Sequence, residues 1–323
     1  MNADKDLFVG IDVGGTSVKE GLFTKTGELL GKVSVPTPPL VDEIGYAAVT
    51  GGIRKLLADV NAPVEALRGI GLAVPCPIPE DGDIKVQANI TLNAPGLADT
   101  LTTVFPEAAV KFENDANAAA LGEAWQGTAA GKKSMVMVTI GTGVGGGVVV
   151  DGKIVSGTNG AGGEIGHMNV NPDEDRVCGC GGHGCLEQYS SATGVVSNYR
   201  IECAKRGVDP IELSGPSDSR SVFQACREGD EVAIAAMDTM ARYLGRALSI
   251  VAAVVDPEAF VIGGGASASA DVYLERLKAY YREYALVACA DTPIEIATLG
   301  NDAGIIGAAY VALQAAYSAL SDK

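Results

Sequence analysis

The same order of predicted elements occurs twice along the 323-residue chain. Each copy consists of an apolar strand, a turn of glycine and threonine, a second strand, a tight turn and a third strand. The first copy has strands at 7–11, 17–23 and 29–35 and its glycine turn at 14–16; the second has strands at 135–140, 146–150 and 153–155 and its glycine turn at 141–143. A chance match of common hairpins is the alternative, and the shared turn chemistry weighs against it. The repeat predicts two related lobes that face one another.

The remaining segments alternate between helical and strand patterns. Helices are expected at 46–60, from 113–115 as far as 125, and at 192–206, 231–255, 272–284 and 303–320; strands at 68–74, 110–112, 258–262 and 294–299; loops at 89–96 and 209–219. This alternation predicts layered α/β lobes. We expect one lobe at 1–115 together with the C-terminal helix 301–323, and a larger lobe at 116–300.

Charge and cysteine content exclude several classes of protein. The chain carries 40 acidic against 24 basic residues, a net charge of −16, which argues against a nucleic-acid surface. No apolar run reaches membrane-spanning length, and the polar start Met1–Asp6 predicts no signal peptide. Seven cysteines, an odd number with three of them clustered, are more typical of a reduced cytoplasmic protein with a metal site than of a disulfide framework.

The two glycine turns are candidates for phosphate binding. Glycines allow phosphate oxygens to approach backbone N–H groups, and Asp12 stands at a strand end just before Gly14, Gly15 and Thr16. A carboxylate in that place can hold Mg²⁺, usually through water. The alternative is an ordinary acid in a tight turn. The second turn, Gly141-Thr142-Gly143, strengthens the phosphate hypothesis because two such turns can hold a triphosphate from both sides.

Asp115 is the candidate catalytic base. It follows a predicted strand and precedes an alanine-rich helix, the place where ligands collect in α/β lobes. An aspartate there can accept a hydroxyl proton as a phosphoryl group is transferred. The alternative is a helix N-cap, a role that aspartate fills well. Capping alone does not require the neighbouring Glu113 and Asn114.

A cysteine cluster predicts a zinc site. Cys178, Cys180 and Cys185 lie within eight residues in a glycine-rich loop, and a histidine completes the four donors of a closed, structural site. His167 and His183 compete for the fourth position. Three buried thiols without a metal are the alternative, but this loop has no hydrophobic pattern. Beside the cluster, Glu164, His167 and Glu187 could hydrogen-bond a polyol.

A third glycine segment, Gly263-Gly264-Gly265, follows another apolar strand. Such a segment lets a flat base and a ribose pack against the backbone. The alternative is a plain strand-to-helix turn, and the segment by itself does not decide between them.

Together these motifs resemble the ROK family (repressors, open reading frames and sugar kinases), and most nearly its bacterial glucokinases. The resemblance extends from about Phe8 to Ala309. Its motifs are Asp12–Lys19 and Gly141–Gly147 for phosphate, Glu113–Glu123 for catalysis, Glu164–His167 and Cys178–Glu187 for sugar and zinc, and Asp256–Gly265 for adenosine. The resemblance implies an actin/hexokinase-like (ribonuclease H-like) α/β fold with two lobes around a cleft.

The resemblance also implies an ATP-dependent hexose kinase, with glucose as substrate and ATP, Mg²⁺ and structural Zn²⁺ as cofactors. Asp115 would be the base, and a homodimer or higher homo-oligomer without membrane or nucleic-acid partners is expected. Implied sugar ligands are Asn89, Asn114, Asp115, Glu164, His167 and Glu187; implied nucleotide ligands are Asp12, Gly14, Gly15, Thr16, Lys19, Thr142, Gly143 and Gly264; implied zinc ligands are His167, Cys178, Cys180 and Cys185.

Two departures from the family pattern concern the sugar. The usual Pro-Gly-Pro is Pro75-Cys76-Pro77, and the usual Asn-Leu-x-Trp is Asn89-Ile90-Thr91-Leu92, which leaves Asn93 as an alternative to Asn89. An N-acetylglucosamine or N-acetylmannosamine kinase is therefore the alternative enzyme. A sugar-sensing regulator is disfavoured by the complete phosphate and base motifs, and because we expect no helix-turn-helix module before the first strand. A purely structural zinc protein would leave the paired glycine turns unexplained.

Overall fold

The computed structural model describes residues 6–79, 84 and 90–321, so the predicted sugar ligand Asn89 lies outside the described residues. The chain forms two compact units, and we describe each by itself. The first unit comprises Met1–Gly131, Gly147–Gly162 and Thr298–Lys323, and the second comprises Lys132–Gly146 and Gly163–Ala297.

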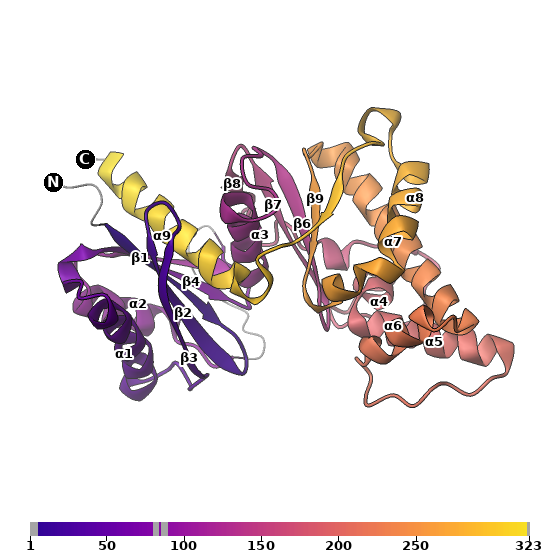
Figure 1. Cartoon of the computed structure of the whole chain (residues 1–323), viewed down its shortest axis with the longest axis horizontal. Helices are drawn as coiled ribbons and strands as arrows, with labels where there is room; N and C mark the ends of the chain where they lie inside the picture. The colour runs from indigo at the N-terminus through magenta and orange to yellow at the C-terminus, as the bar shows by residue number, and fades with distance from the viewer. Residues whose placement is uncertain (1–5, 80–83, 85–89, 322–323) are drawn as a thin grey trace. The chain divides into compact units, whose positions relative to one another are not determined.

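The sheet of the first unit has the strand order β3-β2-β1-β4-β5 (Figure 1). Strands β1, β2 and β3 form an antiparallel meander, and β4 and β5 extend it in parallel on the other side of β1. The strands are β1 (Leu7–Val13), β2 (Ser17–Thr24), β3 (Leu29–Pro36), β4 (Leu67–Val74) and β5 (Ala109–Asn114); the helices are α1 (Glu43–Asp59), η2 (Val64–Ala66), α2 (Ala94–Val104), α3 (Asp115–Gln126), η6 (Gly300–Asp302) and α9 (Ala303–Ser321).

Side chains of β1 alternate between the two faces of this sheet, as the period of a strand requires. Val9 and Ile11 belong to the core that α1 and α2 cover, whereas Gly10 faces α9. A Cβ on Gly10 would lie 1.8 Å from the carbonyl oxygen of Ile305, so only glycine lets α9 lie this close to the sheet. The C-terminal helix is thus part of the first unit, packed on β1, β4, β5 and α3.

The second sheet has the strand order β10-β9-β6-β7-β8. Read from its β8 edge, this order is β8-β7-β6-β9-β10. Counting strands along the chain within each sheet, both orders are then third, second, first, fourth and fifth strand, which confirms the predicted repeat. The strands are β6 (Met135–Ile140), β7 (Val144–Val150), β8 (Lys153–Ile154), β9 (Phe260–Gly263) and β10 (Ile294–Ile296); the helices are η3 (Ile165–His167), α4 (Glu187–Ser190), α5 (Ala192–Arg206), α6 (Ser219–Arg227), α7 (Glu231–Val255), η4 (Gly265–Val272), α8 (Leu274–Tyr284) and η5 (Val287–Cys289).

Two features differ from the sequence prediction. Helices α2 and α6 were not predicted, because both are short and follow segments that read as loops. The predicted lobe boundary at 115 also differs from the observed division, since α3 belongs to the first unit. The reason is its packing against α9: a Cβ on Gly307 would lie 1.6 Å from the carbonyl oxygen of Ala118.

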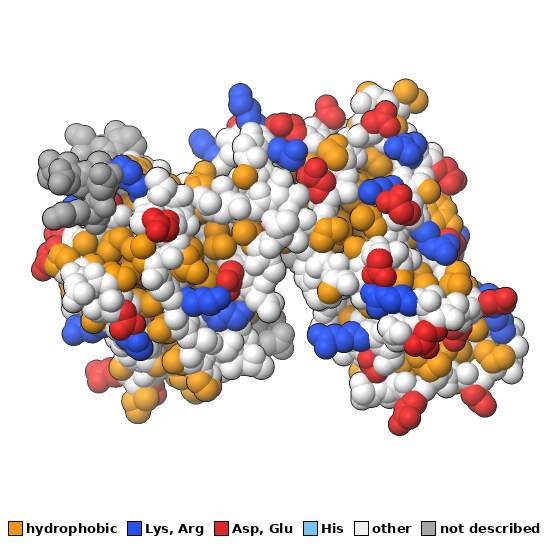
Figure 2. All heavy atoms as spheres, viewed as in Figure 1, with side chains coloured by type: hydrophobic (Ala, Val, Ile, Leu, Met, Phe, Trp, Pro, Cys, Tyr) orange, Lys and Arg blue, Asp and Glu red, His pale blue; other side chains and the backbone are white. Residues whose placement is uncertain are grey.

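Charged side chains of both signs are spread over the face of the molecule drawn in Figure 2. On the face drawn in Figure 2, the basic side chains of the described residues are scattered among acidic ones and form no continuous basic patch. Within residues 6–79, 84 and 90–321, no helix has both the length and the apolar character needed to cross a membrane.

Candidate active site

The first glycine turn connects β1 to β2 and lies beside a charged pair. Asp12, near the end of β1, is half-buried, and its Oδ2 lies 3.4 Å from Nζ of Lys19. The same ammonium donates to the backbone oxygen of Asn301 at 3.3 Å. The turn is closed by a hydrogen bond from the Gly14 N–H to the Ser17 oxygen at 3.0 Å, and Gly15 and Thr16 are exposed. This arrangement offers exposed backbone, a hydroxyl, a cation and a carboxylate within a few residues.

Asn114 and Asp115 mark the junction of β5 and α3. Asn114 is the N-cap: its Oδ1 accepts from the N–H groups of Ala116 at 2.9 Å and Asn117 at 3.1 Å. Its Nδ2 donates to the backbone oxygen of Cys76 at 3.3 Å, which ties the cap to the end of β4. Asp115 is the first residue of the helix, is exposed, and accepts from the Ala116 N–H at 2.8 Å. The capping alternative for Asp115 is therefore wrong, because its neighbour fills that role.

Glu113 holds this junction through two hydrogen bonds. Its Oε1 accepts from the Asn114 N–H at 3.0 Å and from Nδ2 of Asn117 at 2.9 Å. Its side chain is buried, and burial raises its pKa above the ordinary value for glutamate. Glu113 thus holds the turn that presents Asp115.

The second glycine turn connects β6 to β7 and is held by neighbouring side chains. Gly141 accepts from the Ala192 N–H at 2.8 Å, and the Thr142 oxygen accepts from the Thr193 hydroxyl at 3.0 Å. Glu187 accepts from the Val144 N–H at 3.2 Å. A Cβ on Gly143 would lie 2.5 Å from Oε2 of Glu187, so any side chain here would displace that carboxylate.

The cysteine cluster gathers four metal-binding side chains. Donor atoms of His167, Cys178, Cys180 and Cys185 all lie within 4.8 Å of one another. The Sγ atoms of Cys180 and Cys185 are 3.6 Å apart, and Sγ of Cys178 is 3.8 Å from Nδ1 of His167. Tetrahedral zinc, with bonds of about 2.0–2.3 Å, separates its ligand atoms by about 3.3–3.8 Å, so the donor set suits zinc.

His183 lies apart from this group. Its backbone oxygen accepts from Nδ2 of Asn169 at 2.7 Å, and its side chain is exposed. Burial raises the pKa of the Cys178 thiol, and that of Cys185 to about 12, so in the metal-free chain an incoming cation must displace these protons.

Hydrogen bonds outside the cluster order the cysteine loop, and the sequence analysis missed them. Gln188 accepts from the Cys185 N–H at 3.0 Å and donates to the Arg176 oxygen at 2.9 Å. Glu174 accepts from the Arg176 guanidinium and from the Tyr189 hydroxyl at 2.6 Å. The hydrogen bond from Arg176 is the main cause that lowers the pKa of Glu174 to about 2. These partners all lie within residues 174–189, and which of them pair is decided by how the loop folds back onto α4.

Two of the predicted polyol ligands of the second unit, His167 and Glu187, contact this loop. His167 ends η3 and is exposed, and Glu164 is half-buried directly before η3. Glu187 begins α4, and its Oε1 accepts from the Cys178 thiol at 3.4 Å. Glu187 therefore contacts both the cysteine loop and the second glycine turn. Of the two alternative asparagines in the first unit, Asn93 caps α2 by accepting from the Gly96 N–H at 3.2 Å.

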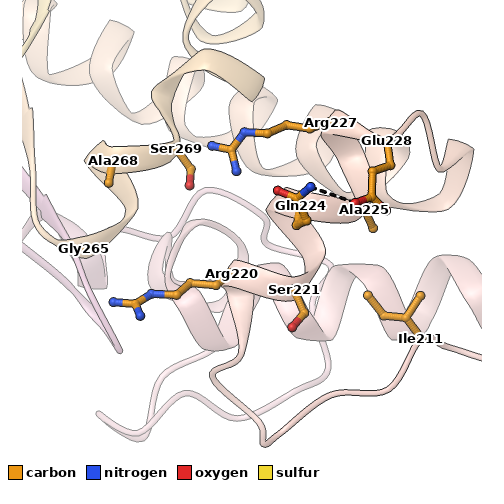
Figure 3. A pocket seen from close by; sticks show the side chains of 10 residues that line it. All are labelled: Ile211, Arg220, Ser221, Gln224, Ala225, Arg227, Glu228, Gly265, Ala268 and Ser269. Atoms are coloured by element: carbon orange, nitrogen blue, oxygen red, sulfur yellow. Dashed lines mark hydrogen bonds between the residues drawn. The ribbon is translucent and has the colours of Figure 1, made fainter.

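A cavity of about 710 Å³ opens in the second unit between α6 and η4 (Figure 3). The glycine segment after β9 reaches it: Gly264 has φ +79, and Gly265 lines the cavity. The opposite wall is α6, which the sequence analysis missed. An Asp218 side chain that accepts from the Ser221 N–H and buried Val222 and Phe223 are the signals that could have predicted this helix.

Comparison with known proteins identifies the family. The ROK family profile matches residues 8–315. A glucokinase from Halalkalibacterium halodurans is 40% identical over 319 residues, which cover 95% of each chain. The crystal structure of a ROK hexokinase from Thermus thermophilus has a TM-score of 0.82 at 34% identity, covering 98% of this chain and 100% of that one. A ROK family glucokinase from Streptomyces griseus, solved with glucose and AMPPNP, has a TM-score of 0.72 at 28% identity, covering 95% of this chain and 99% of that one.

These matches extend over almost the whole chain, and the two mixed sheets share one strand order. The expected actin/hexokinase-like α/β fold is confirmed. On sequence and on structure alike, the chain belongs to the ROK family.

Proposed function

We propose that this chain is an ATP-dependent hexose kinase that converts glucose and ATP to glucose 6-phosphate and ADP. The observation that carries the proposal is the exposed Asp115 carboxylate at the carboxyl end of β5, in a turn fixed by the Asn114 cap and by Glu113. The names of the glucokinase relative and of the structure with glucose and AMPPNP support the choice of glucose and ATP.

In the proposed reaction, Asp115 accepts the proton of the sugar 6-hydroxyl while that oxygen attacks the γ-phosphorus. The new P–O bond forms as the bond to the β-phosphate oxygen breaks, and ADP leaves with its electron pair. A general base of this kind contributes about 10²–10⁴-fold to a rate. Asp115 needs no large reorganisation for this role, because the turn that presents it is already held by hydrogen bonds.

Charge on the transferred phosphoryl group would be offset by both glycine turns. Backbone N–H groups of Gly15 and Thr16 and of Thr142 and Gly143 are proposed to donate to phosphate oxygens, with Lys19 adding a positive charge. The half-buried Asp12 carboxylate fits a role in holding Mg²⁺, which supplies charge neutralisation when bound.

Asn114, Glu164, His167 and Glu187 are the proposed sugar ligands among the described residues. The four-donor cluster of His167, Cys178, Cys180 and Cys185 would hold zinc with no open position, which makes the ion structural. Its proposed effect is to fix His167 and Glu187, since Glu187 already contacts Cys178. A homodimer or higher oligomer remains a prediction from the family resemblance.

The test is a coupled ADP-release assay with ATP and Mg²⁺ and a panel of glucose, N-acetylglucosamine, N-acetylmannosamine, mannose, fructose and allose. We expect turnover with glucose to exceed that with the other sugars. Preference for an acetamido sugar would retain the kinase chemistry and overturn the choice of glucose. No turnover with any sugar, from protein with bound zinc, would overturn the kinase proposal and favour a sugar-sensing regulator.

A further inference from the structure

The cavity between α6 and η4 contains side chains that can distinguish one nucleotide base from another. Arg220, Gln224 and Arg227 follow one another at helical spacing on the α6 wall (Figure 3). Opposite them lies the glycine segment that enters η4, where a Cβ on Gly265 would meet no atom within 4 Å. The wall at Gly265 is therefore open enough for a flat ring to lie against the backbone. The inference below rests on the proposed kinase function.

An ion pair holds the two walls together. Arg227 donates two hydrogen bonds to the Asp271 carboxylate: from Nε to Oδ2 at 2.7 Å and from Nη2 to Oδ1 at 2.7 Å. Arg227 belongs to α6 and Asp271 to η4, so this two-point contact joins the walls. Its charge is neutralised within the protein, which leaves the other α6 side chains to contact a ligand.

Gln224 presents a fixed hydrogen-bond acceptor. Its Nε2 donates to Oε1 of Glu228 at 2.8 Å. A carboxylate can only accept, so this bond assigns the amide nitrogen to the Glu228 side. Figure 3 shows the amide oxygen of Gln224 on the side away from Glu228. Gln224 therefore offers oxygen, not nitrogen, to a molecule in the cavity.

We propose that Gln224 selects adenine over guanine nucleotides. The 6-amino group of adenine can donate to Oε1 of Gln224. Guanine has a carbonyl oxygen at the same ring position, which would face Oε1 as a second acceptor and leave both unpaired. Sites that use a hydrogen bond to recognise a group discriminate strongly against the analogue that lacks it.

Arg220 supplies affinity without this selectivity. In the part of the chain that the structure describes, no acidic side chain forms an ion pair with Arg220. Its planar guanidinium can stack on either purine, because both rings offer a π face. The two α6 residues thus have different effects, one on the ratio between nucleotides and one on binding of both.

The experiment measures initial rates with ATP and with GTP, each with Mg²⁺ and the best sugar, on the full chain. We expect the unaltered protein to prefer ATP in kcat/KM. Gln224→Met should lower the ATP:GTP ratio roughly tenfold, about the effect of one hydrogen bond with its partner left unpaired. Glu228→Gln should lower the ratio in the same direction, because an amide at position 228 can donate as well as accept and no longer fixes the orientation of the Gln224 amide. Arg220→Gln should raise KM for both nucleotides and keep the ratio.

Arg206→Gln is the matched control, with the same charge change on a residue of the second unit that does not line the cavity. It should leave both KM values unchanged. An unchanged ATP:GTP ratio in Gln224→Met and Glu228→Gln, in protein that still phosphorylates sugar, overturns this inference alone. If no sugar is phosphorylated, calorimetric titration with ADP and GDP separates the two proposals. If the protein prefers ADP and Gln224→Met abolishes that preference, the inference holds while the kinase proposal fails. If the protein does not bind ADP, both are overturned.

Discussion

The two glycine turns follow the first strand of two sheets with the same strand order, but their surroundings differ. The turn at Gly14 is flanked by the Asp12–Lys19 pair and leaves Gly15 and Thr16 exposed. The turn at Gly143 is backed by Glu187, whose other oxygen contacts the cysteine loop. The first turn is thus a charged, open loop, and the second is part of a hydrogen-bonded assembly.

This difference shows how a repeated scaffold can acquire two kinds of site. In the first unit, polar groups are held by caps and strand ends: Asn114 bonds to its own helix and to the end of β4. In the second unit, the segment that precedes α4 gathers the cysteines and places Glu187 against the glycine turn. The strands set the position of each turn, and the inserted loop sets its chemistry.

The largest expected effect tests whether the proposed base lies in the first unit. Asp115→Asn should lower kcat about 10²–10⁴-fold and keep sugar binding, because the amide cannot accept the proton. Glu187→Gln, in the second unit, should mainly raise the KM for the sugar. Steady-state kinetics and calorimetric sugar titration measure both. Asp99→Asn, an exposed aspartate on α2, is the control. Substantial turnover by Asp115→Asn would make the base assignment wrong.

The second prediction concerns the metal. Cys180→Ser should reduce bound zinc from about one ion per chain to almost none, since a closed site needs all four ligands. Elemental analysis measures the zinc. Hydrogen exchange should then rise in the loop around Cys178 and stay unchanged at the turn around Gly14, because only the second turn is connected to the cluster through Glu187. Cys226→Ser, outside the cluster, is the control. Equal increases at both turns would contradict the comparison.

A third prediction compares single methyl groups in the turns. Gly143→Ala places Cβ 2.5 Å from Oε2 of Glu187, whereas Gly141→Ala meets no atom within 4 Å. We expect Gly143→Ala to reduce kcat/KM roughly tenfold or more, and Gly141→Ala to act less. Gly14→Ala, with Cβ 3.2 Å from the Ser17 oxygen, should be intermediate. Equal effects of the two second-turn variants would show that Glu187 does not constrain the turn.

The last prediction compares the fourth residue of the second strand in each sheet. We expect a small effect on activity and a measurable effect on stability. In β7 this residue is Gly147, and in β2 it is Glu20, which is fully buried and has no hydrogen-bond partner among the described residues. Burial raises the pKa of Glu20 to about 8. From pH 4.5 to about 8 the unfolded chain has lost the proton that the folded chain keeps, so folding stability falls as pH rises.

Glu20→Met should therefore flatten the dependence of unfolding free energy on pH over that window, by up to about 1.4 kcal/mol per pH unit. The variant should also be more stable than the parent at pH 8. Denaturant unfolding at a series of pH values measures this, with the exposed Glu28→Gln as control. Parallel pH profiles of parent and Glu20→Met would mean that Glu20 is ionised in the folded protein.

Much of the fold was predictable because its signals are local. Alternating apolar residues, Gly/Thr turns and the long helical patterns of α5 and α7 lie within short windows of sequence. Helix α6 was missed because its signal is short: a cap at Asp218 and two buried residues, Val222 and Phe223, after a polar segment. The sequence therefore did not indicate the α6 wall of the cavity, although it did mark the glycine segment on the opposite wall as a candidate nucleotide site.

The sequence by itself determined the repeated strands, the two glycine turns and the spacing of Cys178, Cys180 and Cys185, since each depends only on neighbours along the chain. The tertiary structure decided which histidine joins the cysteines, which carboxylate backs the second turn and which acid is buried without a partner. These outcomes depend on atoms brought within a few ångströms of one another from distant segments, and the burial and hydrogen bonds that follow have no counterpart in local sequence.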